Sequence, residues 1–169
     1  MMSRGAMRTK PRRITAWGAL ASTSLVIAIA LAHPASAEAG RSACVSARDE
    51  IALNARVLQT ELMVAALACG EQKRYNAFVT TFRRELAAQG GSLRRLFSRA
   101  YGSAGTREMN AFVTRLANDA SIRSAVAGGR YCVGAAALMA EAMAAKPDDF
   151  ERLTRSSRLS GRHGFPRCR

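Results

Sequence analysis

The sequence predicts an all-α protein, an antiparallel helical bundle of about five helices with one or two disulfides. After residue 45, apolar residues recur at spacings of three and four along most of the chain, which is the period of one helix face. Glycine pairs and a GSAG segment divide these stretches into helix-sized pieces. No stretch alternates apolar and polar residues for long enough to predict a strand.

Residues 1–37 are predicted to be a signal peptide. Five basic residues and no acid precede an uncharged run over 14–32, and Ala35-Ser36-Ala37 then offers the small side chains that signal peptidase requires. We expect cleavage before Glu38 and a periplasmic or secreted protein with no transmembrane segment after cleavage. The alternative is an uncleaved anchor, because the uncharged run is just long enough to span a membrane.

Residues 38–151 are expected to form the helical bundle domain. Its first helix is predicted over 46–69, where apolar positions recur every three or four residues, and Gly70 is a natural C-terminal stop. The next stripe runs through 75–86. We expect that helix to end at Gly90-Gly91.

Glycines also divide the second half of the bundle. GSAG at 102–105 predicts a loop, and Gly128-Gly129 predicts a second break. The remaining helices are expected between these breaks: 93–101 with Ser92 as its N-cap, a stripe over 109–120, 131–145, and a short last helix starting at Pro147.

The segment NAFVT occurs twice, at 76–80 and at 110–114, with the two copies 34 residues apart. This is the length of a tetratricopeptide repeat, an array with binding roles. No third copy follows and the Trp-Leu-Gly-Tyr pattern of that repeat is missing. We therefore interpret the two copies as core helices that bury the same face.

All four cysteines follow the predicted leader: Cys44, Cys69, Cys132 and Cys168. An even count in an exported chain predicts two disulfides. The first helix is on the order of 35 Å long at 1.5 Å per residue, so Cys44 at its start cannot reach Cys69 at its end. If the 131–145 helix runs antiparallel to the first, Cys69 meets Cys132 and Cys44 meets Cys168. We favour this pairing over 44–132 with 69–168. No two cysteines have the spacing of a zinc site.

Residues 152–169 are predicted to be a basic C-terminal tail. This tail has no acid and six arginines: Arg152, Arg155, Arg158, Arg162, Arg167 and Arg169. Without the leader, 21 Lys and Arg remain against 12 Asp and Glu, a net charge of +9. Such a tail is typical of segments that bind anionic lipid, lipopolysaccharide or polysaccharide. The alternative is a solvated, partly disordered end. Nucleic acid is not expected, because the chain is exported and has no clear base-stacking platform.

No catalytic residue, metal site or cofactor motif is identified. After the leader, His163 is the sole histidine, and GSAGT lacks the lysine of a phosphate-binding loop. We therefore expect a non-enzymatic binding or structural accessory. The alternative is a small periplasmic hydrolase using Glu61 and Glu141, the acids set inside strongly apolar helices.

Three segments carry a resemblance to a known group of proteins. LQTELMVAALACGEQKRYNAFVTTFRREL, MNAFVTRLANDASIR and RYC look like parts of small exported helical proteins of unknown function from alphaproteobacteria. The similarity covers roughly residues 57–145. It implies a helical domain with a Cys69–Cys132 bridge, and it carries no functional residues across.

Overall fold

The computed structural model describes residues 44–156, 158–159 and 161–168. The predicted signal peptide at 1–37 lies outside these residues. The described chain forms α1 (Ala47–Cys69), α2 (Gln72–Thr81), α3 (Arg83–Tyr101), α4 (Gly105–Ala127), α5 (Gly129–Ala144) and the short α6 (Phe150–Thr154). Two 3-10 helices, Gly102–Ala104 and Pro147–Asp149, precede α4 and α6. The prediction of an all-α, disulfide-bonded bundle is confirmed.

Helix α1 is the centre of the bundle. Its N-terminus is capped by the Ser46 side chain, which accepts a hydrogen bond from the Asp49 backbone N–H, and it ends at Gly70 with φ 78°. Leu53, Leu58 and Leu62 on this helix are fully buried. By length and composition α1 could cross a membrane. Its packing against the other five helices accounts for this apolar composition.

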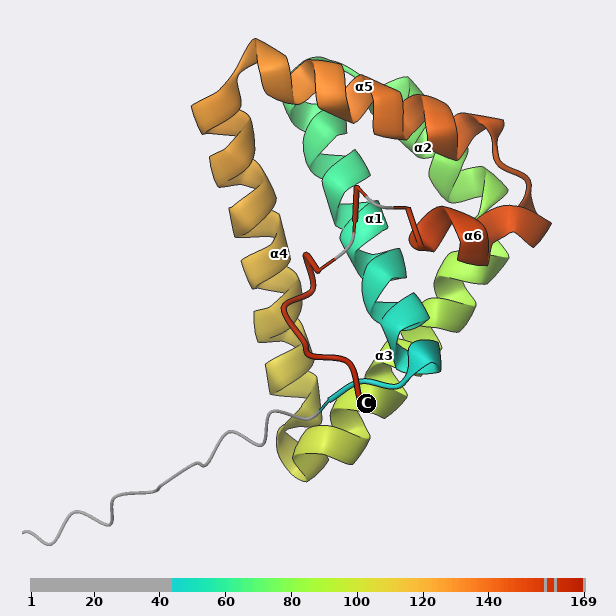
Figure 1. Cartoon of the computed structure of the whole chain (residues 1–169), viewed down its shortest axis with the longest axis vertical. Coiled ribbons are helices and arrows are strands. Elements are labelled where there is room, and N and C mark those ends of the chain that lie inside the picture. Colours follow the sequence, from blue (N-terminus) through green and yellow to red (C-terminus); the bar gives the residue numbers. More distant parts are fainter. Residues whose placement is uncertain (1–43, 157, 160, 169) are drawn as a thin grey trace, which may run out of the picture. The chain divides into compact units, whose positions relative to one another are not determined.

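The other helices surround α1 (Figure 1). Helices α2 and α3 run back along α1, α4 returns beside α1 and α3, and α5 crosses the C-terminal end of α1. Because α5 begins where α1 ends, Cys69 and Cys132 are bonded, with their Cα atoms 5.6 Å apart. The second disulfide joins Cys44 to Cys168. This is the pairing favoured from the sequence.

The predicted break at Gly90-Gly91 is wrong. Helix α3 runs without interruption from Arg83 to Tyr101, and Ser92 is not an N-cap, since its hydroxyl donates a hydrogen bond to the Ala88 carbonyl oxygen. Each helical glycine costs about 1 kcal/mol relative to alanine. Burial of Leu93, Leu96 and Phe97 on one face of the continuous helix offsets that cost. The chain bends instead at Phe82, between α2 and α3.

The described part of residues 152–169 is packed against the bundle. The expected boundary at residue 152 falls inside α6, and Leu153, Leu159 and His163 are buried. Residues 166–168 lie beside Val45, whose N–H donates to the Pro166 carbonyl and whose carbonyl accepts from the Cys168 N–H. We call the described residues 155–156, 158–159 and 161–168 the C-terminal strap. Apolar side chains between the arginines supply these buried contacts, while the Arg155 and Arg167 side chains are 64% and 68% exposed.

Candidate functional site

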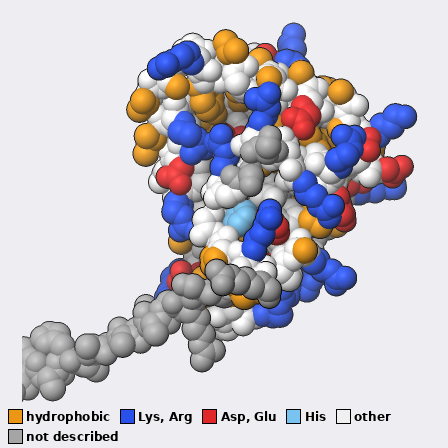
Figure 2. Space-filling view, viewed as in Figure 1, with side chains coloured by type: hydrophobic (Ala, Val, Ile, Leu, Met, Phe, Trp, Pro, Cys, Tyr) orange, Lys and Arg blue, Asp and Glu red, His pale blue; other side chains and the backbone are white. Residues whose placement is uncertain are grey.

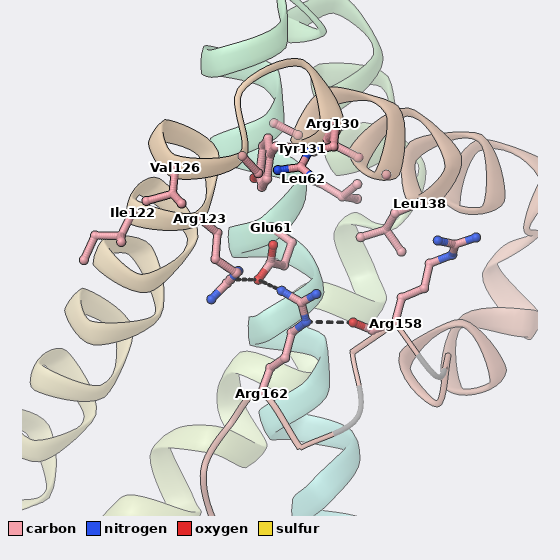
Figure 3. Close-up of a pocket in the computed structure, with 14 residues that line it drawn as sticks. Glu61, Leu62, Ile122, Arg123, Val126, Arg130, Tyr131, Leu138, Arg158 and Arg162 are labelled. Atoms are coloured by element: carbon pink, nitrogen blue, oxygen red, sulfur yellow. Dashed lines mark hydrogen bonds and ion pairs between the residues drawn. The ribbon is translucent and has the colours of Figure 1, made fainter.

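A cavity of about 530 Å³ lies between α1, α4, α5 and the C-terminal strap (Figure 3). This volume is within the range of about 300–1,000 Å³ that is usual for small-molecule sites. The lining residues are Glu61, Leu62, Ala65, Ile122, Arg123, Val126, Ala127, Arg130, Tyr131, Gly134, Ala135, Leu138, Arg158 and Arg162.

The apolar part of the cavity comes from three helices. Leu62 of α1 and Leu138 of α5 are buried, whereas Ile122 and Val126 of α4 are 61% and 81% exposed. Ile122 and Val126 are one helical turn apart and therefore share a face of α4. Small side chains at the remaining apolar positions leave the space unfilled. These are Ala65, Ala127, Gly134 and Ala135.

Glu61 is the acid of the cavity, and two arginines hold it. Its Oε1 atom accepts hydrogen bonds from Arg162 Nη1 at 3.0 Å and from Arg123 Nη2. The Glu61 side chain is only 10% exposed, while those of Arg123 and Arg162 are 40% and 38% exposed. Figure 3 shows the carboxylate between the two guanidinium groups. Glu61 therefore fixes one arginine from α4 and one from the strap at the same point of the cavity.

Two further arginines line the cavity without a carboxylate partner. Neither Arg130 nor Arg158 forms an ion pair with any other described residue. The buried Tyr131 hydroxyl and the Arg123 Nε atom also have no hydrogen-bond partner among the described residues. Burial raises the pKa of Tyr131, and the negative charge of Glu61 raises it further. The cavity thus offers unmatched positive charge and unpaired polar groups beside an apolar wall.

The six arginines predicted to bind anions do not form one patch. Four are paired with acids: Arg152 with Asp149 at 3.0 Å, Arg155 with Glu151 at 3.4 Å, Arg162 with Glu61 at 3.0 Å, and Arg167 Nε with Glu50 Oε1 at 2.8 Å. Within the described part of the tail, Arg158 and Arg162 line the cavity. Arg169 lies outside the described residues.

The sequence analysis did not identify Arg123, Arg130 and Tyr131 as candidate site residues. Arg123 belongs to the end of α4, and the other two open α5. Charge is nearly balanced over residues 38–151, so counting charges along the chain does not single these arginines out. Their position near Cys132 in the sequence could have identified them. The predicted bridge from Cys69 to Cys132 brings the residues around Cys132 to α1, where Glu61 lies.

The two acids of the hydrolase alternative are not brought together. Glu61 lines the cavity, whereas Glu141 is exposed on α5, outside the cavity lining, and accepts a hydrogen bond from the Ser156 hydroxyl at 3.3 Å. Within the described chain, no three His, Cys, Asp or Glu side chains are grouped so that they could hold a metal ion. A general acid and base drawn from these two glutamates would therefore not flank one substrate.

His163 is a buried part of the strap. Its Nδ1 accepts a hydrogen bond from the Phe165 N–H at 3.1 Å, and its ring stacks on Phe165. Burial lowers the pKa of His163, and the nearby Glu50 carboxylate opposes that shift. These contacts give the only histidine after residue 37 a packing role in the strap.

We expect Glu61→Gln to lower the free energy of unfolding by about 1–3 kcal/mol, because the change removes the charge that two partly buried arginines share. Solvent screening of the arginines keeps the loss below that of a fully buried ion pair. Urea unfolding followed by circular dichroism would measure it. Glu108→Gln is the matched control, since Glu108 pairs with an Arg107 side chain that is 74% exposed. Equal stability of the two variants would contradict this role of Glu61.

Comparison of the chain with protein-family models, with curated proteins and with solved structures finds no match. The chemistry of the cavity is therefore the basis for a functional proposal.

Proposed function

We propose that this protein is an exported, non-enzymatic binding protein of the periplasm or the secreted fraction, and that its cavity binds an anionic lipid. The two disulfides indicate an oxidising, extracytoplasmic environment. The predicted signal peptide supports the same location. Resemblance to small exported helical proteins is consistent with this proposal and adds no ligand.

The observation that carries the proposal is the composition of the cavity wall. Leu62, Ile122, Val126 and Leu138 give it an apolar surface, while its lining also contains four arginines and a single carboxylate. An apolar surface favours a hydrocarbon chain, and unpaired guanidinium groups favour a phosphate or carboxylate. Of the anionic envelope components expected from the sequence, an anionic lipid and the lipid part of lipopolysaccharide have both a charged group and hydrocarbon chains, whereas a polysaccharide has no hydrocarbon chain.

The position of the strap supports a binding role over a purely structural one. Arg158 and Arg162 reach the cavity because the strap is anchored by Leu159, by His163 and by the Cys44–Cys168 bond. Of the six tail arginines predicted to contact anionic envelope components, Arg158 and Arg162 would therefore take part in binding, because they lie beside an apolar cavity. The proposed head-group site combines these two with Arg123 and Arg130.

Calorimetric titration of the purified protein with dodecyl phosphate, below its micelle concentration, tests this proposal. We expect dodecyl phosphate to bind at least about tenfold more tightly than dodecyl maltoside, which has the chain without the charge. Butyl phosphate, which has the charge with a short chain, should bind more weakly still because less apolar surface is buried.

Replacing both unpaired arginines in Arg130→Gln/Arg158→Gln should weaken dodecyl phosphate binding by about tenfold or more, because each charged hydrogen bond contributes roughly 1.5–3 kcal/mol. Arg83→Gln/Arg94→Gln is the matched control. It removes the same charge from exposed positions that do not line the cavity, so its affinity should be unchanged. Equal losses in the two double variants would show that net charge, not the cavity, attracts the anion, and would overturn the proposal.

A further inference from the structure

One end of the bundle carries four exposed aliphatic side chains. Leu67 is 71% exposed, Ile122 61%, Val126 81% and Val133 75%. We call these four residues the aliphatic end. The other large hydrophobic residues exposed in the described chain, Tyr101 and Met143, are 37% and 40% exposed.

These four residues are brought to one end by the chain path. The Cys69–Cys132 bond joins the end of α1, two residues after Leu67, to the start of α5, just before Val133. Helix α4 ends at Ala127, directly after Val126, and meets α5 at Gly128. Figure 2 shows hydrophobic side chains gathered with basic ones over this region, at the upper left, where α4 meets α5 in Figure 1.

The charge around the aliphatic end is positive. Residues 119–140 contain two arginines, Arg123 and Arg130, and one acid, Asp119. Lys73, four residues after Cys69, is exposed. The acids closest to the end of α1 in sequence are already paired, Glu61 with two arginines and Glu71 with Arg74.

Exposed aliphatic side chains next to basic ones match the interface of an anionic bilayer. Aliphatic groups enter the boundary between head groups and acyl chains, and Lys or Arg side chains contact the negative head groups. A second copy of this chain is a poorer partner. Two copies related by a twofold axis would bring two surfaces of the same positive charge together, and like charges in contact are unfavourable.

We propose that the aliphatic end docks onto the surface of an anionic lipid bilayer. Ile122 and Val126 belong to both the aliphatic end and the cavity wall, so this edge of the cavity lies beside the docked surface. The idea that membrane lipid enters the cavity rests on the proposed function. Docking itself depends only on the exposed aliphatic side chains and on the basic residues around them.

Vesicle co-sedimentation tests the docking. The protein should bind vesicles of phosphatidylglycerol and phosphatidylcholine and should not bind phosphatidylcholine vesicles alone. Leu67→Ser/Val133→Ser should weaken this binding by at least about tenfold, because both insertable side chains become polar. Both residues are exposed and neither lines the cavity, so folding and dodecyl phosphate affinity should stay unchanged. Met143→Ser is the matched control, since Met143 lies at the other end of α5, and it should bind vesicles like the unaltered protein.

Three outcomes would overturn the docking inference. They are no binding to anionic vesicles, equal binding by the unaltered protein and Leu67→Ser/Val133→Ser, and a stable dimer in analytical ultracentrifugation that this variant abolishes. Failure of the proposed function is a distinct result, in which vesicles bind through the aliphatic end while dodecyl phosphate in solution does not bind.

Discussion

Replacing Phe82 with alanine is expected to lower the free energy of unfolding by about 3–5 kcal/mol. Phe82 is 1% exposed and lies at the bend between α2 and α3. Its ring centroid is 5.2 Å from that of Phe78 and 5.4 Å from that of Phe150. Truncation would therefore leave a cavity that both helix ends and α6 border, and surrounding side chains would fill it only in part.

Urea unfolding with an unchanged denaturant slope would measure this loss. Tyr101→Ala is the matched control, because Tyr101 also stacks on a neighbouring ring, Phe97, but is 37% exposed. Its loss should be clearly smaller, on the order of 1 kcal/mol, since water can occupy the space left behind. A Phe82→Ala protein as stable as the Tyr101→Ala protein would contradict the packing described here.

Removing the Cys44–Cys168 bond by Cys44→Ser/Cys168→Ser is expected to cost about 2–5 kcal/mol of stability. The two cysteines are 124 residues apart in the sequence, so the bond strongly restricts the unfolded chain. The bond also anchors the strap that carries Arg158 and Arg162. We therefore expect weaker dodecyl phosphate binding as well as a lower urea midpoint.

The matched control is Cys69→Ser/Cys132→Ser, whose cysteines are 63 residues apart and outside the strap. This variant should also lose stability, but the Cys44–Cys168 bond would still anchor the strap. If both double variants lost ligand affinity equally under native conditions, the strap would have no specific part in binding. An unchanged urea midpoint in Cys44→Ser/Cys168→Ser would contradict the structural role of the bond.

The all-α fold class and several helix ends could be predicted from the sequence, because their causes are local. The apolar period of residues 46–69 and the Gly70 stop both lie within or beside one helix, and α1 spans Ala47–Cys69. Gly128 likewise marks the corner between α4 and α5. The same local reasoning was wrong at Gly90-Gly91, where burial of α3 against α1 outweighs the weak helix propensity of two glycines.

Disulfide pairing was narrowed from the sequence by helix length and direction. The length of the first helix excludes a bond between Cys44 and Cys69, and the assumed direction of residues 131–145 favoured the pairing that the structure contains. The argument took residues 131–145 to run antiparallel to the first helix, whereas α5 crosses the end of α1 (Figure 1). The start of α5 nevertheless reaches Cys69, and this is the condition that the pairing needs.

Composition and periodicity establish that this chain is helical, that its four cysteines suffice for two bonds, and that its C-terminal segment is basic. Which arginines lie together depends on the packing of separate helices. Glu61 is joined to Arg123 and Arg162, which are 62 and 101 residues away along the chain. Periodicity is a property of one segment, so it locates helices and their buried faces. A cavity forms where small side chains of separate helices face one another, and that depends on how the helices pack.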